Sequence, residues 1–335
     1  MNIMKADSVL INRHVHPYKL IERIGRTCYK SEDVINDDSA VKFVRAMAKN
    51  KHYAMLEHGQ IYLKLNACLE NILEQLGNEA LKYIAIVDCG SDKNGKWYIV
   101  GGSFRAFKEL VYFHSDNFAV NAIGKRLENV YPEVFDGEVS ENTEKVFGDV
   151  NDKPEYISVI EEAEVMSTIN NLQDITKEQK DEYLRSLIVH TVRFFCDRGV
   201  SHEFVRHRPA SFAQESTRYC NYSKDKFGNE ITVIEPCFWT IPEKAELLAV
   251  WADAVQYVEK AYFKLLELGA TPQETRSVLP NSLKTELCIT ATEAEWQHIM
   301  DLRYHGVTGA PHPQMVESMT IIAPVLIEAS QGRLH

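Results

Sequence analysis

Cationic side chains gather in one short stretch of an otherwise acidic chain. The segment RHRPASFAQESTRYCNYS (206–223) carries Arg206, His207, Arg208 and Arg218, has Glu215 as its one acid, and offers few residues for burial. A guanidinium group donates paired hydrogen bonds to a phosphate or a carboxylate. The segment therefore predicts a site for an anionic ligand, and a solvated basic surface is the alternative. Three hydroxyl side chains of the same stretch add donors: Ser211, Ser216 and Thr217.

A second group of ionisable residues lies in HYAMLEHG (52–59), which contains His52, Glu57 and His58. Their spacing matches neither of the zinc motifs HExxH and HxxEH, and the two histidines do not share a helical face. We therefore expect no metal site, and favour a loop that contacts a ligand and precedes a strand. An ordinary pair of surface histidines is the alternative.

The segment WQHIMDLRYHGVTGAPHPQM (296–315) carries Trp296, His298 and Arg303 on or just after one expected helix. His298 and Arg303 are five positions apart, so they do not stack directly on a helix, but both can line the mouth of a pocket. An amphipathic helix with polar residues facing solvent explains the same pattern.

Cysteine usage points to free thiols. Cys220 lies close to the arginines of the first segment, and nearby cations can lower the pKa of a thiol. No His–Asn pattern accompanies it, so we expect a passive thiol rather than a nucleophile. The chain has seven cysteines, an odd number, with no CxxC pair. This usage favours a reducing cytoplasm over a disulfide framework or a zinc site.

Charge and composition limit the partners of the chain. It has 335 residues, a net charge of −11, 45% hydrophobic residues and 25% charged residues. These values are typical of a globular protein with one large domain or two ordinary ones. Nucleic acids and anionic membranes attract a positive field, so we expect neither as a partner. No apolar run is long enough to span a bilayer, and the N-terminus lacks the pattern of a secretory signal.

The spacing of apolar residues predicts the elements that position these groups. Helices are expected over 39–50, 67–77 and 242–269, after capping-box patterns at Thr271–Glu274 and Thr292–Glu295, and from Pro313 onward. Strands are expected over 58–66, 96–103, 186–197 and 283–291. Because strands and helices do not alternate regularly, we predict an α+β fold, with a mixed or antiparallel sheet packed with helices, rather than a doubly wound sheet.

Residues from about 70 to 185 form the least regular part of the sequence. Their acidic middle, FDGEVSENTEKVFGDVNDKPEYISVIEEAEV (135–165), has few apolar residues and several turn formers. This composition indicates an exposed insertion rather than part of the core.

Several ordered segments resemble the flavin-dependent thymidylate synthases. Arg206-His207-Arg208, followed after seven residues by Ser216, is similar to the signature motif of that family. The segments GRTCYKS (25–31), HYAMLEHG, RSVLP (276–280) and MDLRY (300–304) look like further family segments. The resemblance implies a single domain over 1–335, with a family-variable insertion at about 70–185.

The resemblance also implies the reaction, which is the methylation of dUMP to dTMP. In this family 5,10-methylenetetrahydrofolate supplies the one-carbon unit, and FAD reduced by NADPH supplies the hydride. No cysteine attacks the uracil; a cation beside the N3–C4 edge stabilises the electron-rich ring. The family further implies a homotetramer whose active sites are built from several subunits.

The resemblance assigns a role to each residue of this chain that stands at a functional position of the family's motifs. Arg303 matches the arginine that ionises uracil N3, so it is the expected catalytic residue. Ser216 is expected to position the substrate, because an isolated serine without a neighbouring base is weakly activated. The resemblance places dUMP against Glu203, Arg206, Gln214, Glu215, Ser216, Thr217, Arg218, Arg276 and Arg303, with Arg218 and Arg276 as phosphate clamps. It places FAD against His52, Arg206, His207, Arg208, Gln214, Thr292 and His298.

The chain departs from the compact family members at Ala213 and Gln214, where those members often have Asn and Glu. Thr292 and Ala294 stand where some members direct Asn and Arg toward the flavin. Two other functions remain open at this stage. One is a non-enzymatic nucleotide- or RNA-binding module that uses the same arginines, and the other is a different NADPH-dependent flavoenzyme without methyl transfer.

Overall fold

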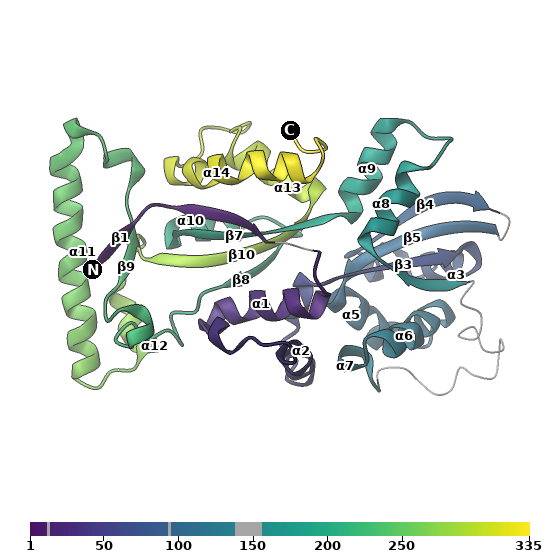
Figure 1. The fold of residues 1–335 in the computed structure, drawn as a ribbon, viewed down its shortest axis with the longest axis horizontal. Coiled ribbons are helices and arrows are strands. Elements are labelled where there is room, and N and C mark those ends of the chain that lie inside the picture. Colours follow the sequence, from purple (N-terminus) through teal and green to yellow (C-terminus); the bar gives the residue numbers. More distant parts are fainter. Residues whose placement is uncertain (12–13, 93–94, 138–155) are drawn as a thin grey trace.

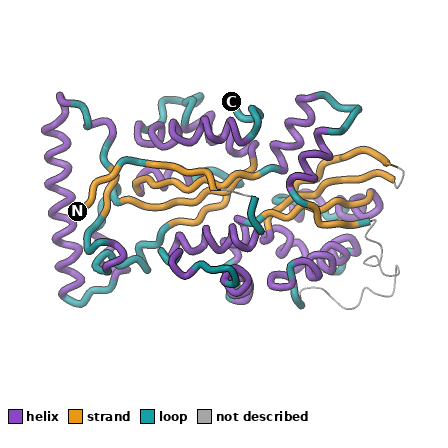
Figure 2. The backbone as a smooth tube through the Cα atoms, in the orientation of Figure 1, coloured by secondary structure: helices purple, strands orange, loops and turns teal. Residues whose placement is uncertain are grey.

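A computed structural model describes residues 1–11, 14–92, 95–137 and 156–335. Two four-stranded sheets lie side by side along the long axis of the molecule, with helices on both faces (Figure 1). Every strand pair within these two sheets is antiparallel. Helices and strands thus mix without the regular alternation of a doubly wound fold (Figure 2). The predicted α+β class with antiparallel sheets is confirmed.

The first sheet has the strand order β2-β7-β10-β8. Alternate side chains of its strands point to opposite faces. Phe194 and Leu287 pack on one face against three helices, and Ala213 and Cys288 pack on the other face against α1. The elements are β2 (Asp7–Ile11), β7 (Val189–Asp197), β8 (Ser211–Gln214), β10 (Lys284–Thr292), α1 (Pro17–Tyr29), α10 (Arg198–Phe204), α13 (Glu293–Arg303) and α14 (Pro313–Ala329).

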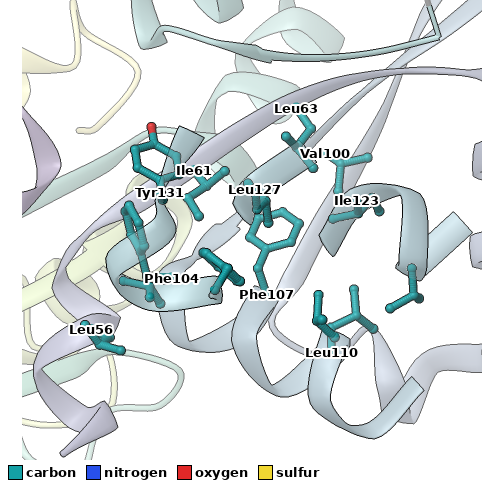
Figure 3. Close-up of a cluster of buried hydrophobic side chains, with 14 of the residues drawn as sticks. Leu56, Ile61, Leu63, Val100, Phe104, Phe107, Leu110, Ile123, Leu127 and Tyr131 are labelled. Atoms are coloured by element: carbon teal, nitrogen blue, oxygen red, sulfur yellow. The ribbon is translucent and has the colours of Figure 1, made fainter. Parts of the chain in front are cut away.

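The second sheet has the order β4-β5-β3-β6. Helices α8 and α9 cover one face, and the larger core fills the other. There Phe104 and Phe107 of α5 pack toward Leu63 and Val100 of the sheet (Figure 3). The elements are β3 (Gln60–Asn66), β4 (Ile84–Asp92), β5 (Gly95–Ser103), β6 (Ile157–Ile160), α2 (Ser39–Lys49), α3 (Ala67–Glu74), α4 (Gly77–Ala80), α5 (Phe104–His114), α6 (Phe118–Val130), α7 (Pro132–Phe135), α8 (Glu162–Asn170) and α9 (Lys177–Leu187).

A long helix, α11 (Ala245–Glu267), stands across the end of the first sheet (Figure 1). It packs near the parallel pair β1 (Asn2–Met4) and β9 (Thr232–Ile234) and near α12 (Pro272–Thr275). Only Val255 and Tyr262 of α11 are buried. The helix therefore leaves most of its surface exposed within one chain.

The helices predicted at 39–50, 67–77, 242–269 and from Pro313 are confirmed, as are the four predicted strands, with ends shifted by a few residues. The α12 capping box is complete, with Thr271 and Glu274 bonded reciprocally. Sequence spacing missed β1, β2, β4, β6, β8 and β9. Strands of three to five residues carry too few alternations to be recognised, and β4 has a register shift between Asp88 and Ser91.

Two expectations about burial were wrong. The acidic segment 135–165 was expected to lie outside the core, but its described ends are buried at Phe135, Ile157 and Val165, because they pack against the second sheet; residues 138–155 lie outside the described residues. The signature segment was expected to bury little, but it buries Ala213 and Cys220, along with His207, Glu215, Thr217 and Tyr222.

Among the described residues, no helix combines the length and the apolar character needed to cross a bilayer.

Candidate functional site

Arg303, the last residue of α13, is held by Glu203 of α10 and by His207 of the signature segment. Its Nη1 donates a hydrogen bond to Oε2 of Glu203 at 2.8 Å, and its Nη2 donates to the backbone carbonyl of Glu203 at 3.2 Å. Its Nε donates to Nε2 of His207 at 3.1 Å. A guanidinium group has five N–H bonds, so two remain for a ligand. Three contacts fix the plane of the group while leaving it able to bind.

Two residues of α13 lie on the other side of His207. Oε1 of Glu295 is 3.5 Å from Nδ1 of His207, and the ring of His298 meets the His207 ring edge-on, with centroids 5.6 Å apart. Glu295 and His298 are three positions apart, so they share one face of the helix. His207 and Glu295 are buried, whereas His298 is exposed. We call Glu203, His207, Glu295, His298 and Arg303 the Arg303 cluster.

Three members of this cluster have side chains that can act as metal ligands. One ligand atom each from His207, Glu295 and His298 lies within 4.8 Å of the other two. No sequence pattern predicts this group, because His207 belongs to a segment far from α13 along the chain. Arg303 disfavours a metal ion at this place. Its Nε–H already donates to His207, and its positive charge repels a second cation.

The signature segment forms an edge of the first sheet. β8 pairs with β10, and its alternation places Ala213 toward α1 and Gln214 toward the opposite face. There Nε2 of Gln214 donates to Oγ of Ser201 at 2.8 Å and to Oγ1 of Thr285 at 3.2 Å. The amide is thus used in fixing α10 to the sheet.

Glu215 pairs with a lysine of the sheet rather than with the neighbouring arginines. Its Oε2 lies 3.0 Å from Nζ of Lys284, which also contacts Glu286. Lys30 and Arg193 contact the Glu286 carboxylate too. Burial alone would raise the pKa of Glu286, but the charges of Lys284 and Lys30 outweigh it and hold the pKa at about 2. This network fastens the end of α1 and the end of β8 to β10.

Three other predicted dUMP residues, Arg206, Arg218 and Arg276, are exposed. The backbone N–H of Arg206 donates to the carbonyl of Glu203 at 3.3 Å, so Arg206 lies beside the Arg303 cluster. The guanidinium of Arg218 lies 5.7 Å from the centroid of the Tyr219 ring, and its backbone N–H donates to Oγ of Ser216. Within the described residues, no hydrogen bond or ion pair joins Arg218 or Arg276 to the Arg303 cluster. Among the described residues, Arg218 and Arg276 thus have no direct polar contact with the cluster.

A cavity of about 590 Å³ opens where the two sheets meet. Arg208 and Thr292 line one wall, and Lys82, Ser103 and Arg105 line the other. The volume falls within the range of about 300–1,000 Å³ that is usual for small-molecule sites. Apolar side chains complete the lining, among them Ile84, Val189, Val205, Phe212 and Ala291.

The cations of the cavity differ in their pairing. Arg105 is neutralised by Glu57 at 2.6 Å and by Glu109 at 2.7 Å. Neither Lys82 nor Arg208 forms an ion pair within the part of the chain that the structure describes. These two side chains, one from each wall, are therefore available to an anionic ligand.

The predicted flavin contacts divide between the cavity and other places. Arg208 and Thr292 line the cavity, as does Ala294. The other predicted contacts do not line it: His52, Arg206, His207, Gln214 and His298. His207 and His298 instead belong to the Arg303 cluster, and His52 and Arg206 are exposed.

His58 lies behind the cavity wall and is fully buried, which rules out a pair of surface histidines. It ends the short 3₁₀ segment Tyr53–His58, and its Nδ1 is 2.7 Å from Oγ1 of Thr290, a residue that lines the cavity. Burial lowers the pKa of His58 to about 4. The ring is therefore neutral near pH 7 and supports the wall from behind.

Sequence reasoning missed three residues of these sites. Lys82 and Arg105 lie in the region expected to be an insertion, and nothing in their local sequence marks them. From the sequence, Glu295 is expected to be the partner of Thr292 in a capping box. The structure shows its backbone N–H donating to Thr292, while its carboxylate turns toward His207.

Comparison with known proteins connects the second half of the chain to one family. The sequence model described as "Thymidylate synthase complementing protein" matches residues 149–322. This span holds the signature segment, Arg276 and the whole Arg303 cluster. It excludes His52 and the Lys82–Arg105 wall of the cavity.

Curated relatives carry the description "Flavin-dependent thymidylate synthase". The chain is 33% identical over 122 residues to one from Thermococcus kodakarensis, a match that covers 35% of this chain and 48% of the relative. It is 34% identical over 106 residues to one from Geobacter sulfurreducens, covering 32% of this chain and 43% of the relative. The matches thus span less than half of either relative's own length.

One solved structure described as a UMP/dUMP methylase, PolB from Streptomyces cacaoi bound with 5-Br dUMP, was also matched. Its TM-score is 0.36 at 19% identity, and the match covers 51% of this chain and 89% of that chain.

Proposed function

Because the chain belongs to the thymidylate synthase complementing protein family, we propose that it is a flavin-dependent thymidylate synthase. The proposed reaction is the reductive methylation of dUMP to dTMP. 5,10-Methylenetetrahydrofolate and NADPH are the proposed co-substrates, and FAD is the proposed cofactor. The observation that carries the proposal is that the matched span contains both the signature segment and Arg303, which meet in three dimensions through His207.

Arg303 is the proposed catalytic residue. Within the part of the chain that the structure describes, two of its N–H bonds make no hydrogen bond, and its charge can stabilise the negative charge that develops when uracil loses its N3 proton. Glu203 and His207 fix the plane of the guanidinium before substrate arrives. A group that is oriented in advance does not have to reorganise during the reaction.

The phosphate of dUMP is assigned to exposed cations of the signature segment and of the segment after α11. Arg218 and Arg276 are the proposed clamps, because each can offer paired donors to a phosphate. Further dUMP contacts are proposed for Glu203, Arg206, Gln214, Glu215, Ser216 and Thr217. Ser216 is a positioning hydroxyl in this proposal, since no base lies within its described contacts.

The cavity between the sheets is the proposed place for part of the flavin. Arg208 and Lys82 can meet its phosphates, and the apolar lining suits an aromatic ring system. When bound, the flavin would supply the hydride that reduces the transferred carbon. Thr292 lines the same cavity, and His52, Arg206, His207, Gln214 and His298 stay as proposed contacts of the rest of the cofactor.

We propose that the active protein is a homotetramer. Leu247, Val250, Ala254 and Tyr257 of α11 are all exposed, at a spacing of three, four and three residues. That spacing forms the seam of a helix pair, and a second copy of α11 is the proposed occupant. Assembly also offers a role to Arg218 and Arg276, which have no direct polar contact with the Arg303 cluster among the described residues, since another copy can complete each site.

The single domain over 1–335, with an insertion at about 70–185, also remains a proposal. It is supported by the cavity, because residues from both sheets line it. In this proposal the second sheet forms one wall of the flavin cavity and has no separate function of its own. None of the seven cysteines, all of which lie in the described residues, forms a disulfide, which suits the proposed location in a reducing cytoplasm.

Release of tritium from [5-³H]dUMP tests the reaction, because the C5 hydrogen leaves when the methyl group is installed. The expected result is release that needs both the folate and NADPH, from protein that carries visible flavin absorbance. NADPH oxidation without tritium release would identify a different flavoenzyme. Colourless protein that cannot be reconstituted with FAD, but binds nucleotides, would identify a non-enzymatic binding module.

A further inference from the structure

We propose that Glu295 is a positioning residue, which fixes the proton of His207 on Nδ1 so that Nε2 can hold the Arg303 guanidinium. The chain of contacts is Glu295, His207, Arg303. The inference rests on the proposed function for its kinetic consequence, but its structural content can be measured without turnover.

The contact between Arg303 and His207 determines where the proton of His207 lies. Nε of an arginine always carries hydrogen, so it can only donate. The 3.1 Å contact therefore requires a lone pair on Nε2 of His207. A neutral imidazole with a lone pair on Nε2 carries its proton on Nδ1. The Nδ1–H bond then faces the carboxylate of Glu295, 3.5 Å away.

The Nδ1–H group of His207 can supply the hydrogen-bond donor that the buried carboxylate of Glu295 lacks. Its side chain is 9% exposed, and its Oε1 is buried without a hydrogen-bond partner among the described residues. A buried carboxylate oxygen without a donor is costly. At 3.5 Å the contact with Nδ1 is an ion-pair distance rather than a short hydrogen bond. Catalytic hydrogen bonds are often long in ligand-free structures and shorten in the complex, so we expect this contact to close when dUMP engages Arg303.

The position of Glu295 on α13 supports this role. It is the third residue after the N-cap Thr292, where a capping-box carboxylate would turn back to the backbone N–H of Thr292. Thr292 does accept a hydrogen bond from the backbone N–H of Glu295 at 3.3 Å. The carboxylate, however, points to His207 instead. The helix N-terminus favours a negative charge at this place.

A metal ion is the competing occupant of the same side chains, because His207, Glu295 and His298 could each offer a ligand. A metal at Nδ1 of His207 would move the proton to Nε2, where it would face the N–H of Arg303. The two arrangements therefore exclude each other. The observed contact of Arg303 favours the proton over the metal.

The experiment compares Glu295→Leu, which removes the acceptor, with Glu295→Gln, which keeps an acceptor oxygen without the charge. Asp301→Asn is the matched control, since it removes one charge from the same helix and its contact is with Gln297. Solid-state NMR of protein labelled with ¹⁵N-histidine reports the protonated nitrogen of His207. Tritium release gives kcat and the KM for dUMP.

We expect the Nδ1–H form of His207 in the wild type and in Asp301→Asn, and its loss in Glu295→Leu. In Glu295→Leu, kcat should fall about 10- to 100-fold, as expected for a hydrogen bond to a charged group, while KM changes little. Glu295→Gln should recover part of kcat.

Three results would overturn the inference. These are an Nε2–H form of His207 in the wild type, an unchanged kcat in Glu295→Leu, or the binding of one equivalent of Co²⁺ or Zn²⁺ that is lost in both Glu295 variants. If the wild type releases no tritium, the proposed function fails, while the NMR result still decides the proton position.

Discussion

The guanidinium of Arg303 donates a hydrogen bond to Nε2 of His207 at 3.1 Å, across 96 positions of sequence. His207 lies just after α10 and Arg303 ends α13, and both helices pack on the same face of the first sheet. This contact joins the predicted catalytic arginine to the signature segment. It also makes the effect of changing Arg303 predictable.

Arg303→Ala should reduce tritium release from [5-³H]dUMP at least 100-fold, because the charge beside the uracil ring is lost. Flavin should stay bound, since the cavity lining does not include Arg303. Arg303→Lys keeps the charge but not the planar fork, so we expect an intermediate rate. Arg45→Ala, at an exposed ion pair with Glu133, is the control. Normal turnover in Arg303→Ala would remove its catalytic role.

Arg208 and Arg218 should serve different ligands. Arg208→Ala should weaken flavin binding about 10- to 100-fold, because it removes one of two unpaired cations of the cavity. Arg218→Ala should weaken dUMP binding by a similar factor and leave the flavin in place. Absorbance titration with FAD and calorimetry with dUMP measure the two affinities. If each variant loses both ligands equally, the separation of the two sites is wrong.

Charge placed on the exposed seam of α11 should break the proposed assembly. Val250 and Tyr257 are 70% and 75% exposed in one chain. The double variant Val250→Asp/Tyr257→Asp should lower the mass seen by light scattering and reduce turnover together, because buried unpaired carboxylates are unfavourable. Gln256→Asp, exposed on the same helix, should leave the mass unchanged. An unaltered tetramer in the double variant would place the interface elsewhere.

The ion network around Glu286 should make stability sensitive to acid. The pKa of Glu286 is lowered from 4.5 to about 2 in the folded chain, so its contribution is fully present above pH 4.5 and is lost as the pH falls toward 2. Urea unfolding between pH 6 and pH 2 measures this loss. Glu286→Gln should lower stability most at pH 6 and flatten the decline. Glu267→Gln, at an exposed pair with Lys264, should keep the wild-type profile.

Cys220 should prove dispensable for the reaction. Its side chain is buried beside Tyr222 and Val255, where it fills space rather than facing a ligand. Cys220→Ala should retain nearly full tritium release and lower the free energy of unfolding by about 1 kcal/mol. Complete loss of turnover in a folded variant would restore a thiolate mechanism.

The sequence predicted the long elements well because their patterns are local. The apolar spacing of 242–269 predicted α11, and Gly269 marked its C-terminal end, where it adopts a left-handed φ of 94°. Pro242, expected in the first turn, instead opens the 3₁₀ segment Pro242–Lys244 that precedes the helix. The signature segment likewise predicted ligand contacts for Arg206, His207 and Arg208; the structure places Arg208 in the cavity lining and His207 in the Arg303 cluster. Short strands such as β8 were missed, since packing on β10 rather than local preference keeps them extended.

The sequence by itself determined the α+β class, the positions of the main helices, and the residue types available for an anionic substrate. It also marked Arg303, through a local motif. Only the tertiary structure decided which of these side chains meet. Glu295 faces His207, and Lys82 shares a cavity with Arg208, because strands and helices from distant parts of the chain pack together. Periodicity within a segment reports which face is buried, but it carries no information about the partner on the other side.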